Sequence, residues 1–113
     1  MTDIALDELH RRLGEVVVLD VRSEGEYEGT AGYPCDPRQG HISGARNVPV
    51  QELLNRPPEE LRALVGETPG AELVCYCHSG GRSEHAAAAL RAAGYDARNY
   101  RGSWHEWSRA VPE

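Results

Sequence analysis

The sequence predicts an α/β fold in which a mostly parallel sheet is covered by helices on both faces. Strand-like and helix-like segments alternate along the whole chain, which is typical of parallel sheets with crossover helices. The apolar run 16–19 shows no alternation of polar and apolar residues, as expected of a strand buried on both faces. The length of 113 residues suits one domain, 1–113, with a single buried core.

The first elements are a helix and a strand. Leucines recur at helical spacing at Leu6, Leu9 and Leu13, and Gly14 is a natural helix end. The strand 16–19 follows directly. Because this strand is rich in β-branched residues, we place it inside the sheet rather than in a helix.

A capping box begins the second helix, and a long loop follows it. Ser23 and Glu26 have the spacing at which each side chain caps the backbone N–H of the other, so we expect a short helix that ends near Gly29. The segment 29–40 contains three glycines and two prolines, too many for regular structure. It predicts a surface loop.

The middle of the chain predicts a short strand and two helices. The segment 46–49 ends in a proline, which lacks an N–H donor and places the strand at an edge of the sheet or at its own end. A brief helix is expected over 50–55. A second is expected over 59–65, because two adjacent prolines precede it at the position where proline costs least.

The last third predicts a strand at 72–76, a helix over about 83–93 and a final strand at 96–100. Trp104 and Trp107 then share one face of a terminal helix that packs on the sheet. In sheets of this class, ligands bind at the carboxyl ends of the strands. The loop after the strand 72–76 is therefore the candidate site.

Composition excludes several classes of function. The formal net charge is −6, which argues against nucleic acid or an anionic membrane as a partner. No apolar run approaches the roughly 20 residues that span a bilayer, and Asp3 is unlike a basic signal-peptide start. Three cysteines, Cys35, Cys75 and Cys77, are too few for a disulfide framework and favour a reducing compartment. We expect a soluble, cytoplasmic protein.

Cys77 is the candidate nucleophile because it ends the strand 72–76 and begins the loop before the next helix. Backbone N–H groups and the positive end of the helix dipole converge at such a position. Both favour the thiolate, which is the form that attacks. Gly80 and Gly81 are expected to supply backbone angles that other residues resist, and Arg82 adds a permanent positive charge.

The other two cysteines are expected to have no catalytic role. Cys75 lies two residues earlier on the same strand, where side chains alternate between faces, and we expect it in the core. Cys35 is expected to be an exposed loop thiol. It forms a disulfide with Cys77 only if its loop folds over the site. His41 is expected to be a packed structural histidine.

A metal site is a rival interpretation of the same region. It would use Cys75, Cys77, His78 and His85 as ligands. The helix carries His85 away from the strand, however, and the spacing fits no zinc pattern. We therefore expect no bound metal.

Four sequence motifs, taken in order, resemble those of the rhodanese-like sulfurtransferases. They are LDVR at 19–22 with EY at 26–27, GHISGARNVP at 40–49, YCHSGGRS at 76–83 and RGSW at 101–104. The resemblance covers nearly the whole chain. It implies the rhodanese-like fold with a five-stranded, mostly parallel sheet, a persulfide intermediate on Cys77, and no metal or organic cofactor.

The resemblance implies a thiosulfate sulfurtransferase. Cys77 would take the outer sulfur of thiosulfate or a similar small-molecule donor and pass it to cyanide or a thiol acceptor. The alternative is a persulfide carrier or binding module that receives sulfur from a partner in a sulfur relay and turns over free thiosulfate poorly. The loop 77–82 has six residues, whereas phosphatase relatives carry one more. Phosphatase or arsenate reductase activity is accordingly disfavoured.

The resemblance also assigns the residues around Cys77. The loop that binds the donor comprises His78, Ser79, Gly80, Gly81, Arg82 and Ser83. We expect His78 and Ser79 to lie near the mouth and tune donor choice, and Arg82 to support the loop or bind an anion. Asp20 and Arg22 are expected to be supporting residues that fix loops at the strand ends by hydrogen bonds and ion pairing.

Two departures from the family pattern lie between the first two motifs. The loop 29–40 is longer than in most single-domain rhodaneses and resembles the C-terminal half of tandem-domain thiosulfate and mercaptopyruvate sulfurtransferases. Those tandem enzymes often have a substrate-binding arginine where this chain has Glu26. Arg38, in the same loop, is the candidate replacement as a substrate contact.

Overall fold

The computed structural model describes residues 2–112. Its strands are β1 (Val17–Asp20), β2 (Arg46–Asn47), β3 (Glu72–Tyr76) and β4 (Asp96–Asn99). Its helices are α1 (Leu6–Arg11), α2 (Glu24–Glu28), α3 (Val50–Asn55), α4 (Pro58–Val65), α5 (Gly81–Ala92) and α6 (Ser103–Ala110). Within residues 2–112, no helix has the length and apolar character needed to cross a membrane.

The sheet is parallel, with strand order β2-β1-β3-β4. The predicted edge position of β2 is confirmed. The expected count of five strands is wrong for the described residues, which form four. At the β4 edge, a single parallel bridge joins Asp3 to Asn99, and the Ile4 N–H donates to the Asn99 carbonyl at 3.0 Å. The chain turns into α1 at Leu6, so only this short stretch can pair with β4.

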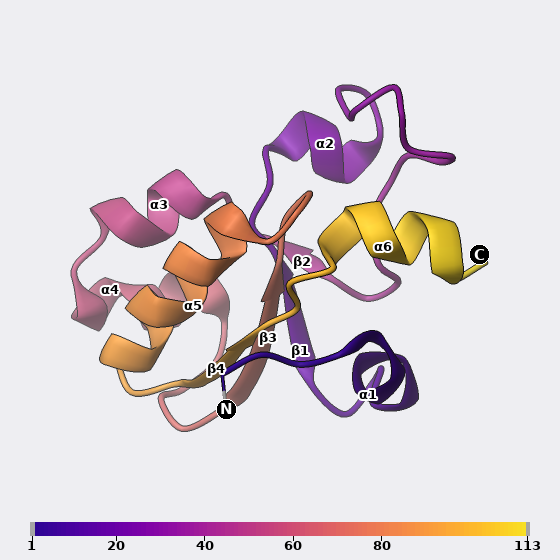
Figure 1. Ribbon diagram of the computed structural model, residues 1–113. Helices are drawn as coiled ribbons and strands as arrows, with labels where there is room; N and C mark the ends of the chain where they lie inside the picture. The colour runs from indigo at the N-terminus through magenta and orange to yellow at the C-terminus, as the bar shows by residue number, and fades with distance from the viewer. Residues whose placement is uncertain (1, 113) are drawn as a thin grey trace.

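Helices cover both faces of the sheet, as predicted. In Figure 1, α3, α4 and α5 lie on one side, and α1 and α6 lie on the other. Alternate residues of β3 enter two separate cores: Leu73 and Cys75 pack on the α5 side, whereas Val74 packs on the α6 side. Trp104 and Trp107 are buried in the second core, which confirms their predicted structural role.

Several local predictions are also confirmed. Ser23 and Glu26 form the expected capping box, and α2 ends at Gly29 in the left-handed conformation. The segment 29–40 contains no helix or strand. It is not wholly a surface loop, however, because Asp36 is buried within it. The helix expected from Ser83 begins two residues earlier, at Gly81.

Candidate active site

Cys77 directly follows the carboxyl end of β3. The chain turns there from β3 into α5 (Figure 1). We call residues 77–83 the active loop. Because α5 begins at Gly81, its first turn and its positive dipole end lie within this loop. The Cys77 side chain is therefore close to backbone N–H groups that have no partner within the helix.

The Cys77 sulfur accepts several hydrogen bonds. The Gly80 N–H donates to Sγ at 3.1 Å, and the Ser83 hydroxyl donates at 3.4 Å. Burial raises the pKa of the Cys77 thiol, but the Ser83 hydroxyl and the N–H groups of Ser83, Gly80 and Ser79 lower it by more. The net effect is a pKa below the ordinary cysteine value, which favours the thiolate.

The two loop glycines have different roles. Gly80 has φ of 100°, and an added Cβ would lie 2.7 Å from the Arg101 carbonyl oxygen. Gly81 is not in the left-handed region, and its added Cβ would meet no atom within 4 Å. The expectation that both positions need glycine is therefore wrong for Gly81, because this residue already has helical geometry at the start of α5.

Ser103 is a site residue that the sequence did not reveal. Its hydroxyl accepts the Cys77 N–H at 3.0 Å and lies 4.0 Å from the Cys77 sulfur. Ser103 is fully buried and has φ of 55°, an uncommon conformation for a residue other than glycine. Ser103 lies in the sequence motif 101–104, but nothing in that motif indicated a contact with Cys77.

The start of α6 also binds the backbone of the active loop. The N–H groups of Trp104 and His105 donate to the carbonyls of Cys77 and His78 at 2.9 and 3.0 Å. From the end of β4, the Asn99 amide donates to the Gly80 carbonyl at 3.2 Å. The loop carbonyls are thus held by neighbouring elements, so the loop N–H groups are left to face the sulfur.

Cys75 is buried in the core, as predicted. Its exposed fraction is 0%, and burial raises the pKa of its thiol to about 12. Cys77 is equally inaccessible, with an exposed fraction of 1%.

Arg82 forms an ion pair with the residue that departs from the family pattern. Its two terminal nitrogens lie 2.9 and 3.1 Å from the carboxylate oxygens of Glu26. Burial raises the pKa of Glu26, but the hydrogen bonds from Arg82 and Ser23 lower it by more. The resulting pKa is about 2. Glu26 is therefore ionised at neutral pH and neutralises Arg82 of the active loop.

Asp20 and Arg22 form a buried ion pair at the end of β1. The Arg22 guanidinium lies 2.6 Å from Asp20 Oδ2 and also donates to the Gly40 carbonyl at 2.6 Å. The Tyr76 hydroxyl donates to Asp20 Oδ2 at 2.7 Å. This network joins the ends of β1 and β3 to the end of the loop 29–40.

The loop 29–40 packs against the active loop at His78. The Tyr33 ring stacks on the His78 ring with centroids 3.7 Å apart, and His78 Nε2 lies 3.1 Å from Asp36 Oδ2. From α6, Arg109 donates to Asp36 Oδ1 at 2.9 Å. His78 is thus partly covered, whereas Ser79 beside it is exposed.

Arg38 contacts α6. Its guanidinium lies over the Trp104 ring, 4.9 Å from the centroid, and donates to the Val111 carbonyl. Arg38 also lines a cavity together with His10 and Trp107. His41 stacks on Tyr27 with centroids 3.8 Å apart and is partly buried, in line with a structural role.

The four residues expected as ligands in the alternative metal-site interpretation do not lie close together. Among residues 2–112, the group of cysteine, histidine and carboxylate atoms close enough to share an ion is Cys35, Asp36 and His78. Cys75 faces the core, and His85 is exposed on α5. The four-residue set built on Cys75 and Cys77 is therefore not formed.

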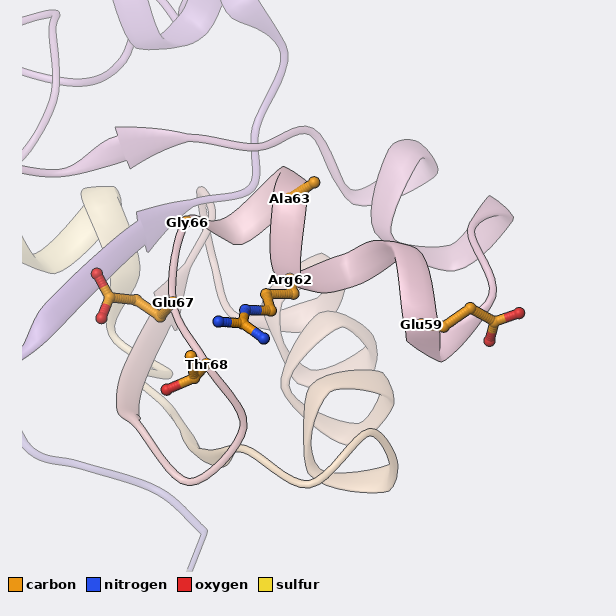
Figure 2. Close-up of a pocket in the computed structure, with 6 residues that line it drawn as sticks. All are labelled: Glu59, Arg62, Ala63, Gly66, Glu67 and Thr68. Carbon is orange, nitrogen blue, oxygen red and sulfur yellow. The ribbon is translucent and has the colours of Figure 1, made fainter.

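A separate hollow lies beside α4 (Figure 2). Its lining residues are Glu59, Arg62, Ala63, Gly66, Glu67 and Thr68. Arg62 points toward the loop that carries Glu67 and Thr68, whereas Glu59 points away from it (Figure 2). No lining residue belongs to the active loop, so this hollow is not part of the Cys77 site.

Known proteins resemble this chain in sequence and in fold. A model of the rhodanese-like domain matches residues 5–110. The sulfur carrier protein TtuD of Thermus thermophilus is 39% identical over 114 residues, which cover 87% of this chain and 40% of TtuD. The chain thus spans about 40% of the length of the curated relatives it matches.

Two solved structures resemble the chain over nearly its full length. One is a probable thiosulfate sulfurtransferase, with 44% identity and a TM-score of 0.85 over 96% of this chain and 45% of that one. The other is the human single-domain sulfurtransferase TSTD1, with 33% identity and a TM-score of 0.78 over 99% of both chains. Since sequence and fold agree over this span, the chain belongs to the rhodanese-like domain family.

Proposed function

We propose that this protein is a sulfurtransferase that carries sulfane sulfur as a persulfide on Cys77. The Cys77 thiolate attacks the outer sulfur of thiosulfate, the sulfur–sulfur bond of the donor breaks, and sulfite leaves with the bonding electrons. A cyanide ion or a thiolate then attacks the outer sulfur of the persulfide. The Cys77 thiolate is released, and the enzyme is ready for another donor.

The observation that carries this proposal is the set of donors around the Cys77 sulfur. Gly80 and Ser83 donate to Sγ, and the pKa of the thiol is lowered despite burial. The same donors are aimed at a site that holds negative charge both before and after sulfur transfer. Such preorganised donors stabilise the anion without reorganising during the reaction.

A persulfide carrier is the second candidate, and two observations favour it. Glu26 neutralises Arg82, so this cation is already paired before any anionic donor arrives. The relative TtuD is named a sulfur carrier protein. In this case a partner protein loads Cys77 and another removes the sulfur.

We place the protein in the cytoplasm. Its three cysteines, Cys35, Cys75 and Cys77, are all free thiols, which suits a reducing compartment. Arg38 remains our candidate contact for the anionic donor, tested by Arg38→Ala. A weaker apparent affinity for thiosulfate supports it, and an unchanged affinity removes it from the site.

Two measurements on the intact protein test the proposal. After treatment with thiosulfate, mass spectrometry should find one added sulfur atom on the peptide that contains Cys77. Absence of this adduct at every donor concentration contradicts sulfur transfer through Cys77. Steady-state thiocyanate formation from thiosulfate and cyanide then distinguishes the two candidates, because a carrier loads once and turns over slowly.

A further inference from the structure

We propose that Cys35, Asp36 and His78 form a binding site for a soft divalent cation, with Zn²⁺ as the best match. The three residues come from the loop 29–40 and from the active loop. One ligand-type atom of each lies within 4.8 Å of the other two. The site is distinct from the sulfur of Cys77 but adjoins it through His78.

The distances suit a tetrahedral ion. His78 Nε2 lies 3.1 Å from Asp36 Oδ2. Two ligands bound at about 2.1 Å to a tetrahedral Zn²⁺ lie about 3.4 Å apart, so these two atoms already have nearly the required separation. Cys35 is a free, exposed thiol, and its sulfur lies within 4.8 Å of the other two ligand atoms.

Asp36 supplies the second observation, because one of its buried oxygens lacks a partner. The side chain is fully buried, and Oδ1 accepts from Arg109 at 2.9 Å. Oδ2 has no hydrogen bond among the described residues, and the aligned contact from His78 reaches Oδ1 at 3.4 Å. A buried carboxylate oxygen without a donor is costly, and a bound cation would satisfy it.

The chemistry of the three groups selects the ion. A thiolate and an imidazole favour zinc over magnesium or calcium, which prefer oxygen ligands. The thiolate and the carboxylate offset the two charges of the ion, and Arg109 holds the other oxygen of Asp36, as outer partners of metal ligands commonly do. A water molecule would complete the tetrahedral coordination, as in zinc sites with three protein ligands.

Occupation of this site has a consequence for Cys77 that rests on the proposed function. The ion would tie the loop 29–40 to His78, which directly follows Cys77. Tyr33 already stacks on the His78 ring, and Cys77 is 1% exposed. A loop held in this position keeps donors away from the sulfur, so Zn²⁺ acts as an inhibitor of sulfur loading.

The binding test uses reduced, metal-free protein with Cys77→Ser, so that the nucleophile cannot act as a competing thiolate ligand. Titration with Co²⁺ should give one equivalent bound, with a thiolate-to-cobalt absorption band that Zn²⁺ removes. Adding Cys35→Ser should abolish the band and weaken Zn²⁺ binding by at least about 100-fold, since loss of even an outer partner costs 10–100-fold. His85→Ala, at an exposed histidine outside the cluster, is the matched control and should bind Zn²⁺ unchanged.

Two results would overturn the metal site: Zn²⁺ binding that survives Cys35→Ser, or binding that is already lost with Cys77→Ser alone. The inhibitory role is tested separately, by following persulfide formation with and without Zn²⁺. Zn²⁺ should slow loading of the wild type by at least about tenfold and leave Cys35→Ser unaffected, and equal inhibition of both overturns this role. If neither protein forms a persulfide while Co²⁺ still binds, the proposed function fails and the metal site stands.

Discussion

The centre of β3 and the loop that follows it each hold a cysteine that is almost inaccessible to solvent. The pKa values of the two thiols are shifted in opposite directions. Cys75 and Cys77 enter the same core, with exposed fractions of 0% and 1%. Burial raises the pKa of Cys75 to about 12, whereas the pKa of Cys77 is lowered despite burial. Burial raises the pKa of both thiols, and more so at Cys75, but only Cys77 has hydrogen-bond donors that lower its pKa.

The end of the sheet explains where those donors come from. Within β3, Cys75 is paired with Leu19 of β1 and Asn99 of β4, so its neighbours use their N–H groups in the sheet. At Cys77 the ladder has ended, and the N–H of Gly80 turns toward the sulfur. The boundary between strand and helix, rather than exposure to solvent, thus supplies the donors that lower the pKa of Cys77.

Replacing each cysteine by serine should give the largest difference in persulfide formation between these two regions. Cys77→Ser should abolish persulfide formation, because the serine hydroxyl cannot accept a sulfane sulfur. Cys75→Ser should keep most of the activity and lose some stability, because it buries a hydroxyl in an apolar core. Mass spectrometry after thiosulfate treatment measures both variants. A persulfide that persists in Cys77→Ser and disappears in Cys75→Ser would reverse the assignment.

The two loop glycines test whether the donor geometry matters. Gly80→Ala places a methyl group 2.7 Å from the Arg101 carbonyl at φ of 100°, so the loop must shift. We expect the rate of sulfur loading to fall by about 100-fold, because small displacements of an active-site group have effects of this size. Gly81→Ala, the matched control, should load at the wild-type rate. Equal rates for the two variants would show that the position of the Gly80 N–H is unimportant.

The comparison also shows which features a sequence can reveal. β3, Cys77 and the turn into α5 were predictable because each depends on neighbouring residues and on local periodicity. Ser103 was not, since its contact with Cys77 depends on the packing of α6 against the active loop. Asp36 was missed for a similar reason: a loop rich in glycine and proline gives no sign that one of its carboxylates is buried beside His78. We expected a fifth strand, but the chain near Asp3 makes only a single bridge to β4. The family pattern does not reveal how early α1 begins and ends this pairing.

Removing a single donor should have a smaller effect than moving the loop. Ser83→Ala deletes the hydroxyl that donates to Cys77 Sγ at 3.4 Å. A hydrogen bond to a charged group contributes about 1.5–3 kcal/mol, so the pKa of Cys77 should rise and alkylation at pH values below that pKa should slow by about tenfold or more. The pH profile of iodoacetamide alkylation measures both, and the rate should recover at alkaline pH. Ser79→Ala, at an exposed side chain, is the control. A Ser83→Ala profile that coincides with the wild type would exclude this donor.

The smallest expected effect concerns stability at alkaline pH and isolates Cys75. Because its folded pKa of about 12 lies above the unfolded value, Cys75 contributes stability that is complete below the unfolded pKa and is lost as pH rises toward about 12. Denaturant unfolding of Cys77→Ser should therefore show a free energy of unfolding that falls between about pH 8 and about pH 9.5. Adding Cys75→Ala should remove about 1 kcal/mol of this decrease, because alanine does not titrate. Parallel curves for the two proteins would mean that Cys75 titrates in the folded state as freely as in the unfolded chain.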